Sequence, residues 1–511
     1  MIQPDVSRRF LLLLLCVAVL SACDCGDDSS GRAGGDDDLV PLDDDSDDDQ
    51  IDDDSDSIGE HREQPGDIGV RVLGIDNSGV RIFTTSEGKW VEEPIETGIG
   101  GIFLTRESGN YGSAAQADNP ENDLIAHFDG TVWRTETPPV DLENGYFHGL
   151  EVSDEEVYVL GSSYSHSKAV DWVIYDTIIS RGSDGLWVVD TLPDLKAPSF
   201  IPSWFVDTEG NVRIAGNDLF SRKGFVLRRE SAGWVAEDLP ALGTSWLISN
   251  GIDRFKSAPT GGYWLLANEE SNQRGAILSL QDGVWEALTL PAVSANWALH
   301  EMAICADGTA YAAGSDYENQ HGFVLRYDAG GWTVEEVPGL YVVEEEQDDL
   351  HHADYIVDVA CDADSLPWVA VSRVPSNVIN FSLISRRSGA WAEEDLPGND
   401  GVGCERSILV DALGRVLVLV VSYENAKDLY SVGRAYSLVA GEWVETNLSF
   451  LDLNVSWAFW DVAVASDGSI LVEASEIFGW PDHLLKWDGV AWTVIDPVVG
   501  SFFDIGGVVA Y

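Results

Sequence analysis

The chain has few basic residues. Lysine and arginine together number 29, against 88 aspartates and glutamates, which gives a formal net charge of −59. Proteins that bind nucleic acid need a basic surface to contact the phosphates, so this balance excludes nucleic acid as a partner. The composition predicts a strongly hydrated surface that repels copies of itself, and we therefore expect a monomer.

Long apolar runs are also missing, apart from Phe10–Leu20. This run follows Arg8-Arg9 and is too short to span a membrane as a helix, which is typical of a secretory signal peptide. It ends in Leu20-Ser21-Ala22-Cys23, which resembles a lipobox, the bacterial signal for cleavage before a cysteine that then receives lipid. The sequence therefore predicts a lipoprotein signal peptide over residues 1–22 and lipidation, including palmitate, at Cys23.

A lipid-bearing Cys23 would anchor the chain to a membrane, because several acyl chains together give stable attachment. We expect the protein in the cell envelope, outside the cytoplasm. The outer membrane or cell surface is favoured, with the inner membrane as the alternative.

Residues 23–65 lack the apolar content that a folded core needs. The segment Asp24–Ser57 holds sixteen aspartates and a single arginine. Such a composition predicts a disordered, extended tether. The aspartate runs lack the glycine and terminal glutamate of a calcium-binding EF-hand loop, so we expect diffuse attraction of counterions here.

Helical periodicity is missing beyond residue 65, and an internal repeat takes its place. A glycine followed closely by a tryptophan recurs nine times at spacings of 43 to 59 residues. Apolar segments flank each tight turn, as in GFVLRRESAGW and GFVLRYDAGGW, which predicts a β-hairpin. The nine tryptophans are Trp90, Trp133, Trp187, Trp234, Trp285, Trp332, Trp391, Trp443 and Trp492.

A second hairpin precedes the first in most units, as in MAICADGTAYAAG and VAVASDGSILVEA. Each unit thus predicts four antiparallel strands, and repeated four-stranded units of this length indicate an all-β fold, a single β-propeller, over residues 66–511. Seven units look complete and two, around Trp90 and Trp133, look short of strands. Eight blades are favoured, with nine next. The tail GSFFDIGGVVAY is expected to close the ring as a strand, which removes exposed strand edges.

The tryptophans are expected to be structural blade markers that fill the wedge between neighbouring blades. The acidic pair that follows several of them, as in WTVEEVP, is expected to face water. Cys305 and Cys361 hold the same place in successive repeats, which would separate them, so we expect buried thiols here, with a disulfide as the alternative.

The turn before the tryptophan resembles a degenerate Asp-box of sialidase-like propellers. Ser183-Asp184-Gly185-Leu186-Trp187 is the nearest segment, although the residue between the Asp and the Gly of an Asp-box is missing here. With the lipobox, the repeat resembles the propeller lipoproteins of bacteria with large secretomes. The resemblance implies a fold and no activity. Sialidases need an Arg-Ile-Pro segment, and Val80-Arg81-Ile82-Phe83 lacks the proline.

Motifs for catalysis are also missing: no Gly-x-Ser-x-Gly, His-Glu-x-x-His or Cys-x-x-Cys pattern occurs. We assign no catalytic residue, no cofactor and no metal site. The densest polar segment, VVEEEQDDLHHADYIVD, contains weak metal candidates. Adjacent histidines on an extended chain point opposite ways, so a solvated acidic loop is favoured. The candidates are Glu345, Asp349, His351 and His352.

The missing motifs and the irregular loops between repeats favour a noncatalytic binding or scaffold module for a protein or glycan. The alternative is a glycoside hydrolase or lyase with carboxylates at the mouth of the propeller channel, which requires a pair of carboxylates in a concave pocket. A role in assembling outer-membrane barrels ranks last, because the repeat does not match the motifs of that propeller family.

Overall fold

The structure, a computed structural model, describes most of residues 70–510. The predicted signal peptide, Cys23 and the tether of residues 23–65 lie outside the described residues. The described residues are 70–76, 79–86, 89–95, 99–104, 111–116, 123–128, 131–136, 145–152, 157–167, 170–181, 185–190, 199–206, 211–218, 221–230, 233–242, 245–248, 255–269, 274–341, 355–373, 380–397, 402–411, 414–425, 428–446, 448, 457–465, 467–476, 483–496 and 504–510.

The described residues form strands and no helix, which confirms the predicted all-β class. The strands are β1 Val70–Asp76, β2 Gly79–Ser86, β3 Lys89–Glu93, β4 Ile99–Leu104, β5 Tyr111–Gln116, β6 Asp123–Phe128, β7 Trp133–Glu136, β8 Gly145–Val152, β9 Val157–Ser167, β10 Val170–Arg181, β11 Trp187–Asp190, β12 Ser199–Val206, β13 Val212–Asp218, β14 Lys223–Glu230, β15 Gly233–Ala236, β16 Trp246–Ile248, β17 Phe255–Ser257, β18 Tyr263–Glu269, β19 Arg274–Gln281, β20 Val284–Ala287, β21 Trp297–Ile304, β22 Ala310–Asp316, β23 His321–Asp328, β24 Gly331–Tyr341, β25 Tyr355–Cys361, β26 Pro367–Arg373, β27 Asn380–Ser385, β28 Ala392–Glu394, β29 Val402–Val410, β30 Val416–Asn425, β31 Asp428–Val439, β32 Glu442–Thr446, β33 Trp457–Val464, β34 Ile470–Glu476, β35 His483–Trp487, β36 Trp492–Val494 and β37 Asp504–Ala510.

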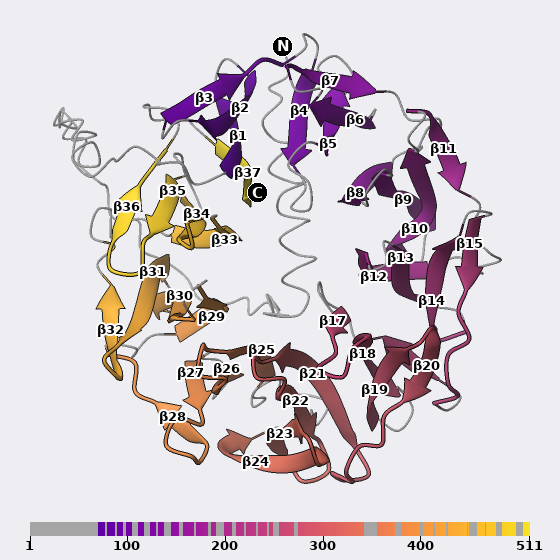
Figure 1. Cartoon of the computed structure of the whole chain (residues 1–511). Coiled ribbons are helices and arrows are strands. Elements are labelled where there is room, and N and C mark those ends of the chain that lie inside the picture. The colour runs from indigo at the N-terminus through magenta and orange to yellow at the C-terminus, as the bar shows by residue number, and fades with distance from the viewer. Residues whose placement is uncertain are drawn as a thin grey trace, which may run out of the picture. The chain divides into compact units, whose positions relative to one another are not determined.

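These strands form a β-propeller whose four-stranded antiparallel blades follow one another in chain order (Figure 1). Each blade runs from an inner strand to an outer strand, and the repeated tryptophan lies on this outer strand or, in β28, directly before it. The last strand, β37, pairs with β1 and supplies the inner strand of the first blade, as the sequence predicts. The blades are, in order, β37-β1-β2-β3, β4–β7, β8–β11, β12–β15, β16–β20, β21–β24, β25–β28, β29–β32 and β33–β36.

Hydrogen-bonded pairing joins the strands into six sheets, and the two larger sheets divide into the sets above at links of a single residue pair. We number these sets as blades 1 to 9 in chain order, and the number of blades in the ring stays a prediction. The two units that look short in the sequence both gain their missing strand. Blade 1 takes β37 from the far end of the chain. Blade 2 begins with β4, whose glycine-rich sequence IGGIFL has weak strand character when read alone.

Burial along each blade explains why these segments form strands. A strand in the middle of a blade is covered on both faces, so it is a continuous run of small and apolar residues; all seven residues of β22 are buried. Outer strands alternate, as in β20, where the tryptophan points inward between exposed neighbours. The tight turn that leads into β20 has both Asp282 and Gly283 at positive φ, the conformation of a two-residue hairpin turn.

Antiparallel pairing gives the ring two different faces. The turns that join the first strand of a blade to the second, and the third to the fourth, lie on one side, which we call the short-turn face. The links from the second to the third strand, and from one blade to the next, lie on the other side, which we call the connector face. Along the connector face the links range from residues 168–169 to residues 342–354.

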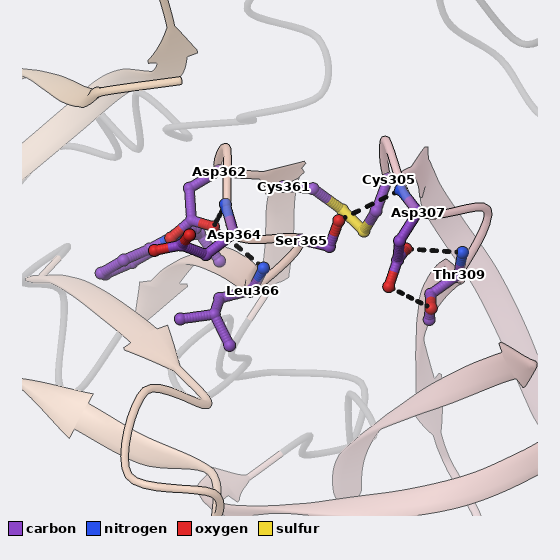
Figure 2. The surroundings of a disulfide bond; sticks show 9 residues. Cys305, Asp307, Thr309, Cys361, Asp362, Asp364, Ser365 and Leu366 are labelled. Carbon is purple, nitrogen blue, oxygen red and sulfur yellow. Dashed lines mark hydrogen bonds between the residues drawn. A yellow bond between two sulfur atoms is a disulfide. The ribbon is translucent and has the colours of Figure 1, made fainter. Parts of the chain in front are cut away.

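Cys305 and Cys361 form a disulfide between blades 6 and 7 on the short-turn face (Figure 2). The expectation of buried thiols is therefore wrong. The backbone N–H of Cys305 bonds to Thr309 across its turn, whereas the matching bond in blade 7 starts one residue later, at Asp362. This one-residue offset turns the two cysteine side chains to opposite faces of their strands, and hence toward each other.

We predict that replacing Cys305 or Cys361 with serine destabilises the ring. A native disulfide that joins distant residues typically contributes about 2–4 kcal/mol, mainly by restricting the unfolded chain. Urea unfolding with and without reductant measures this: reductant should lower the midpoint of the wild type and of Cys404→Ser but not that of Cys305→Ser. A wild-type midpoint that ignores reductant would contradict the pairing.

Candidate functional site

The joints between blades contain the most regular polar feature of the described structure. The indole Nε1 of Trp391 in blade 7 donates to Oε2 of Glu335 in blade 6 at 2.8 Å, and that of Trp443 in blade 8 donates to Oε2 of Glu394 in blade 7 at 3.0 Å. The same bond joins four further pairs: Trp133 to Glu93, Trp187 to Glu136, Trp234 to Asp190 and Trp285 to Glu237.

Each of these carboxylates stands three residues after the tryptophan of its own blade, and we call it the joint carboxylate. Successive side chains of a strand alternate between its two faces, so an odd spacing places the two groups on opposite faces. Trp391, for example, points back toward blade 6, while Glu394 points forward toward blade 8. Every outer strand of this kind thus carries a donor on one face and an acceptor on the other.

Arginines neutralise all six joint carboxylates. Three come from the blade that also supplies the tryptophan; Arg386 Nη2, for example, lies 3.3 Å from Glu335 Oε1. The others come from the carboxylate's own blade, as where Arg387 Nη1 lies 3.0 Å from Glu394 Oε2. The remaining pairs are Arg71–Glu93, Arg181–Glu136, Arg229–Asp190 and, for Glu237, both Arg213 and Arg228.

Three joints depart from this pattern. In blade 8 the joint position holds Thr446, whose hydroxyl accepts from Trp492 at 2.9 Å. At the joint that closes the ring, Trp90 donates to the backbone carbonyl of Ile495 at 2.7 Å. In blade 5 the position holds Leu288, and the facing Trp332 has its Nε1 buried without a partner.

The expectation that both acids of the repeat face water is therefore wrong for one of them. In WTVEEVP, Glu336 is exposed, but Glu335 is half-buried and serves as the joint carboxylate. The sequence signal is an acid three residues after tryptophan, at the same spacing in six repeats. The two neighbouring acids look alike in the sequence, and only their spacing from the tryptophan distinguishes them.

A shallow pocket of 350 Å³ opens beside the joint of blades 7 and 8. Three of its charged groups, Arg387, Glu393 and Glu394, are already engaged in structural contacts. Glu394 accepts from Ser385 Oγ and Trp443 and pairs with Arg387, which also donates to the carbonyl of Gly441 in blade 8. Glu393 accepts from Ser382 at 2.6 Å. The pocket lining therefore belongs to the joint.

Blade 6 holds a buried polar network on the connector face. Asp316 accepts from Ser294 Oγ at 2.7 Å and from the backbone and side chain of Asn319, and His321 Nε2 lies 3.9 Å from its Oδ2. Burial alone would raise the pKa of Asp316. The hydrogen bonds from Asn319 and Ser294 and the nearby His321 outweigh it, so the pKa lies below its usual value and the carboxylate stays ionised.

Aspartates also hold the turns of the short-turn face. Asp307 accepts from the backbone and hydroxyl of Thr309, while its own N–H donates to Ser365 Oγ of blade 7 at 3.2 Å (Figure 2). Burial would raise the pKa of Asp307, but the hydrogen bonds from Thr309 and Ser365 bring it below the usual value. Asp467 is similar: burial raises its pKa less than the bonds from Lys486 and Ser469 lower it.

The structure places the nine repeated tryptophans on the outer strands or directly beside them, and most are buried. The weak metal candidates Glu345, Asp349, His351 and His352 lie outside the described residues, as does Cys23. Among the residues that the structure does describe, no group of three or more His, Cys, Asp and Glu side chains could hold a metal. In the same part of the chain no helix is long and apolar enough to cross a membrane.

No family model and no curated protein matches the chain. Several solved structures have a similar fold. Puromycin hydrolase matches 69% of this chain and 54% of its own at 15% identity and a TM-score of 0.39, so this chain spans about half its length. Dihydro-heme d1 dehydrogenase NirN matches 75% and 74% at 15% identity and a TM-score of 0.42. An ulvan lyase of a polysaccharide lyase family matches 80% and 95% at 11% identity and a TM-score of 0.37. At these similarities the neighbours assign no function to the chain.

The neighbouring glutamates of blade 6 give a matched test of the joint. Glu335→Ala leaves the Trp391 N–H and the Arg386 guanidinium without their carboxylate, so we expect the free energy of unfolding to fall by about 2–4 kcal/mol. Glu336→Ala removes an exposed carboxylate and should change it by less than about 0.5 kcal/mol. Denaturant midpoints measure both, and equal effects would contradict the assigned role of Glu335.

Proposed function

We propose that this protein is a lipid-anchored propeller of the cell envelope that binds a protein or glycan through its connector face without converting it chemically. The observation that carries this proposal is the difference between the two faces. Short turns with repeated aspartate hydrogen bonds recur on one side, while links of very different length occupy the other. Binding residues in proteins concentrate on variable loops that a rigid scaffold holds in place.

The joint chemistry supports a scaffold role. The repeated carboxylates, tryptophans and arginines bond to one another between blades. The assembly of the ring therefore explains why the same residue types recur in successive repeats. The acidic net charge favours a partner that is neutral or basic. The proposal includes the resemblance to Asp-box turns. Its support is the turn before Trp492, where the Asp488 carboxylate accepts from the backbone N–H groups of Val490 and Ala491.

The Cys305–Cys361 disulfide supports the envelope location. Disulfides form and persist in oxidising compartments outside the cytoplasm. This agrees with the signal peptide and lipobox of residues 1–23, which would place Cys23 at the membrane and the ring beyond the tether.

One observation favours the alternative, a glycoside hydrolase or lyase. The inner strands of blades 6, 7 and 8 each carry a β-bulge, and an acid follows it at the same register: Glu301, Asp358 and Glu405. Bulges can re-aim side chains near active sites. Asp358, however, accepts from the N–H of Val359 and from that of Ile408 in blade 8, at 2.8 and 3.1 Å, so it holds the joint as well.

The anchor is tested by radiolabelled palmitate in growing cells. Wild type should carry the label and sediment with membranes, whereas Cys23→Ala should lose both, because the acyl chains are attached through this cysteine. Cys25→Ala is the matched control and should keep them. Label that persists in Cys23→Ala would place the lipid elsewhere.

The binding face is tested by a photo-cross-linking residue at one exposed position on each face. A residue in place of Glu318, in the β22–β23 link, should give a defined adduct in intact cells, while one in place of Val490, in the β35–β36 turn, should not. A glycan array with the purified ring tests a glycan ligand in the same way. Adducts from Val490 alone, or release of reducing ends or unsaturated sugars from a polysaccharide panel, would overturn the proposal.

A further inference from the structure

The joint between blades 5 and 6 differs from its nearest equivalent, the joint between blades 7 and 8. In the latter, Glu394 accepts from two neutral donors, the Nε1 of Trp443 in the next blade and the Oγ of Ser385 on the adjacent strand. Arg387 neutralises the carboxylate at 3.0 Å. A second tryptophan, Trp368, stands opposite Ser385 and packs edge-on against Trp443 with ring centroids 5.5 Å apart.

Blade 5 keeps these donors and lacks the acceptor. Trp264 stands opposite Ser279, and its ring centroid lies 5.3 Å from that of Trp332 in blade 6, as in the other joint. The joint position holds Leu288, however. Trp332 Nε1 and Ser279 Oγ, the counterparts of the two groups that bind Glu394, are both buried without a hydrogen-bond partner.

A second acceptor is missing from the same blade. In blade 7, Trp368 Nε1 donates to Oδ2 of Asp362, six residues earlier, at 3.1 Å. The residue six before Trp264 is Ala258, which occupies the same turn position by its backbone bond to Gly262. Trp264 is 1% exposed, and its Nε1 has no partner.

Charge is absent from this joint as well. Gln281 stands where blade 7 has Arg387, four residues before the repeated tryptophan, and Leu288 packs in an apolar cluster with Trp332 and Tyr327. Besides apolar packing, which has no preferred direction, the contacts across this joint are neutral: the Asn268 side chain exchanges two hydrogen bonds with the backbone of Leu299, and β19 forms a single bridge to β21. Three buried polar groups at the joint have no partner.

The inner strand of blade 5 is divided, which is an independent difference. It consists of two three-residue strands, β16 and β17, that both pair with β18. Each of the other blades has one longer inner strand among its described residues. The backbone pairing of blade 5 at its inner edge is thus interrupted, although it includes as many residue pairs as that of blade 7.

We propose that the ring opens at the joint between blades 5 and 6. Opening a joint of the usual kind breaks charge-assisted bonds between an indole, a carboxylate and an arginine. Opening this joint breaks no charge-assisted bond, only the neutral bonds of Asn268 with Leu299 and the bridge between β19 and β21. It also lets water reach the N–H groups of Trp264 and Trp332 and the hydroxyl of Ser279. The free energy of local opening is therefore lower here than at blades 7 and 8.

Hydrogen exchange of the full chain, followed by mass spectrometry, tests the proposal. The second strands of a blade are buried, so their amides report joint opening. We expect β18 and β22 to exchange at least about tenfold faster than β26 and β30. Equal rates in the two pairs, or slower exchange in β18 and β22, would overturn the proposal.

Leu288→Gln supplies the missing acceptor. The amide oxygen can accept from Trp332 and Ser279 and needs no arginine, which this joint does not provide. We expect exchange in β18 and β22 to slow by about tenfold, as for two regained hydrogen bonds. Leu290→Gln, in the same apolar cluster, is the matched control and should not slow it. Adding Trp332→Phe to Leu288→Gln should remove much of the gain.

The opposite change, made in blade 7, tests the proposal even if the Leu288 and Leu290 variants do not fold. Glu394→Leu copies the blade 5 arrangement into blade 7, so exchange in β26 and β30 should rise by about tenfold or more while that in β18 and β22 stays unchanged. If Glu394→Leu has no effect on β26 and β30, or if Leu288→Gln behaves like Leu290→Gln, the missing acceptor does not determine where the ring opens.

Discussion

The hydrogen bond from a buried indole to an oxygen of the preceding blade fixes how the blades of this ring are aligned. A blade buries both of its faces only when neighbours stand on both sides, and apolar packing between sheets tolerates sliding because it has no direction. An indole N–H that slides away from its acceptor stays buried and unpaired, which is costly. Each joint except that of blades 5 and 6 therefore combines apolar packing, which supplies most of the burial, with an indole hydrogen bond that specifies the position.

The charge balance of the chain gives this contact a second role. With 88 acidic and 29 basic residues, repulsion within the ring opposes compact packing. A half-buried carboxylate is tolerated only with a counter-charge, and the structure provides one at all six joint carboxylates, as Arg386 does for Glu335 and Arg71 for Glu93. The few arginines thus lie beside partly buried carboxylates, where a positive charge offsets the largest desolvation cost.

Much of this architecture could be predicted from the sequence, because it depends on local periodicity. The repeat of glycine and tryptophan, the two hairpins of each unit and the closing strand β37 are all visible in the chain. The first two blades have a weaker sequence signal than the others. Blade 1 takes strand β37 from the C-terminal end of the chain, and β4 has a glycine-rich sequence with weak strand character. Tertiary contacts such as these carry no local signal.

The contacts at the joints depend partly on local sequence spacing and partly on tertiary structure. The acid three residues after tryptophan was visible in the sequence, and the odd spacing alone places it on the face opposite the tryptophan. The disulfide is not evident from the sequence because Cys305 and Cys361 look equivalent in the repeat, and only the backbone bonds of Cys305 and Asp362 show the one-residue offset. The arginine partners could not be predicted, because they come from either blade.

The division of contacts between the two faces connects the fold to its proposed use. The disulfide, the Asp307 turn and the Asp467 turn all lie on the short-turn face, and the joint carboxylates lie along the outer strands. Substitutions in the connector links leave these contacts intact, so the links can vary in length and sequence while the ring keeps its alignment. For the proposed binding module, a change of specificity through the connectors would leave the joints unchanged, which is the physical reason to look for a ligand on that face.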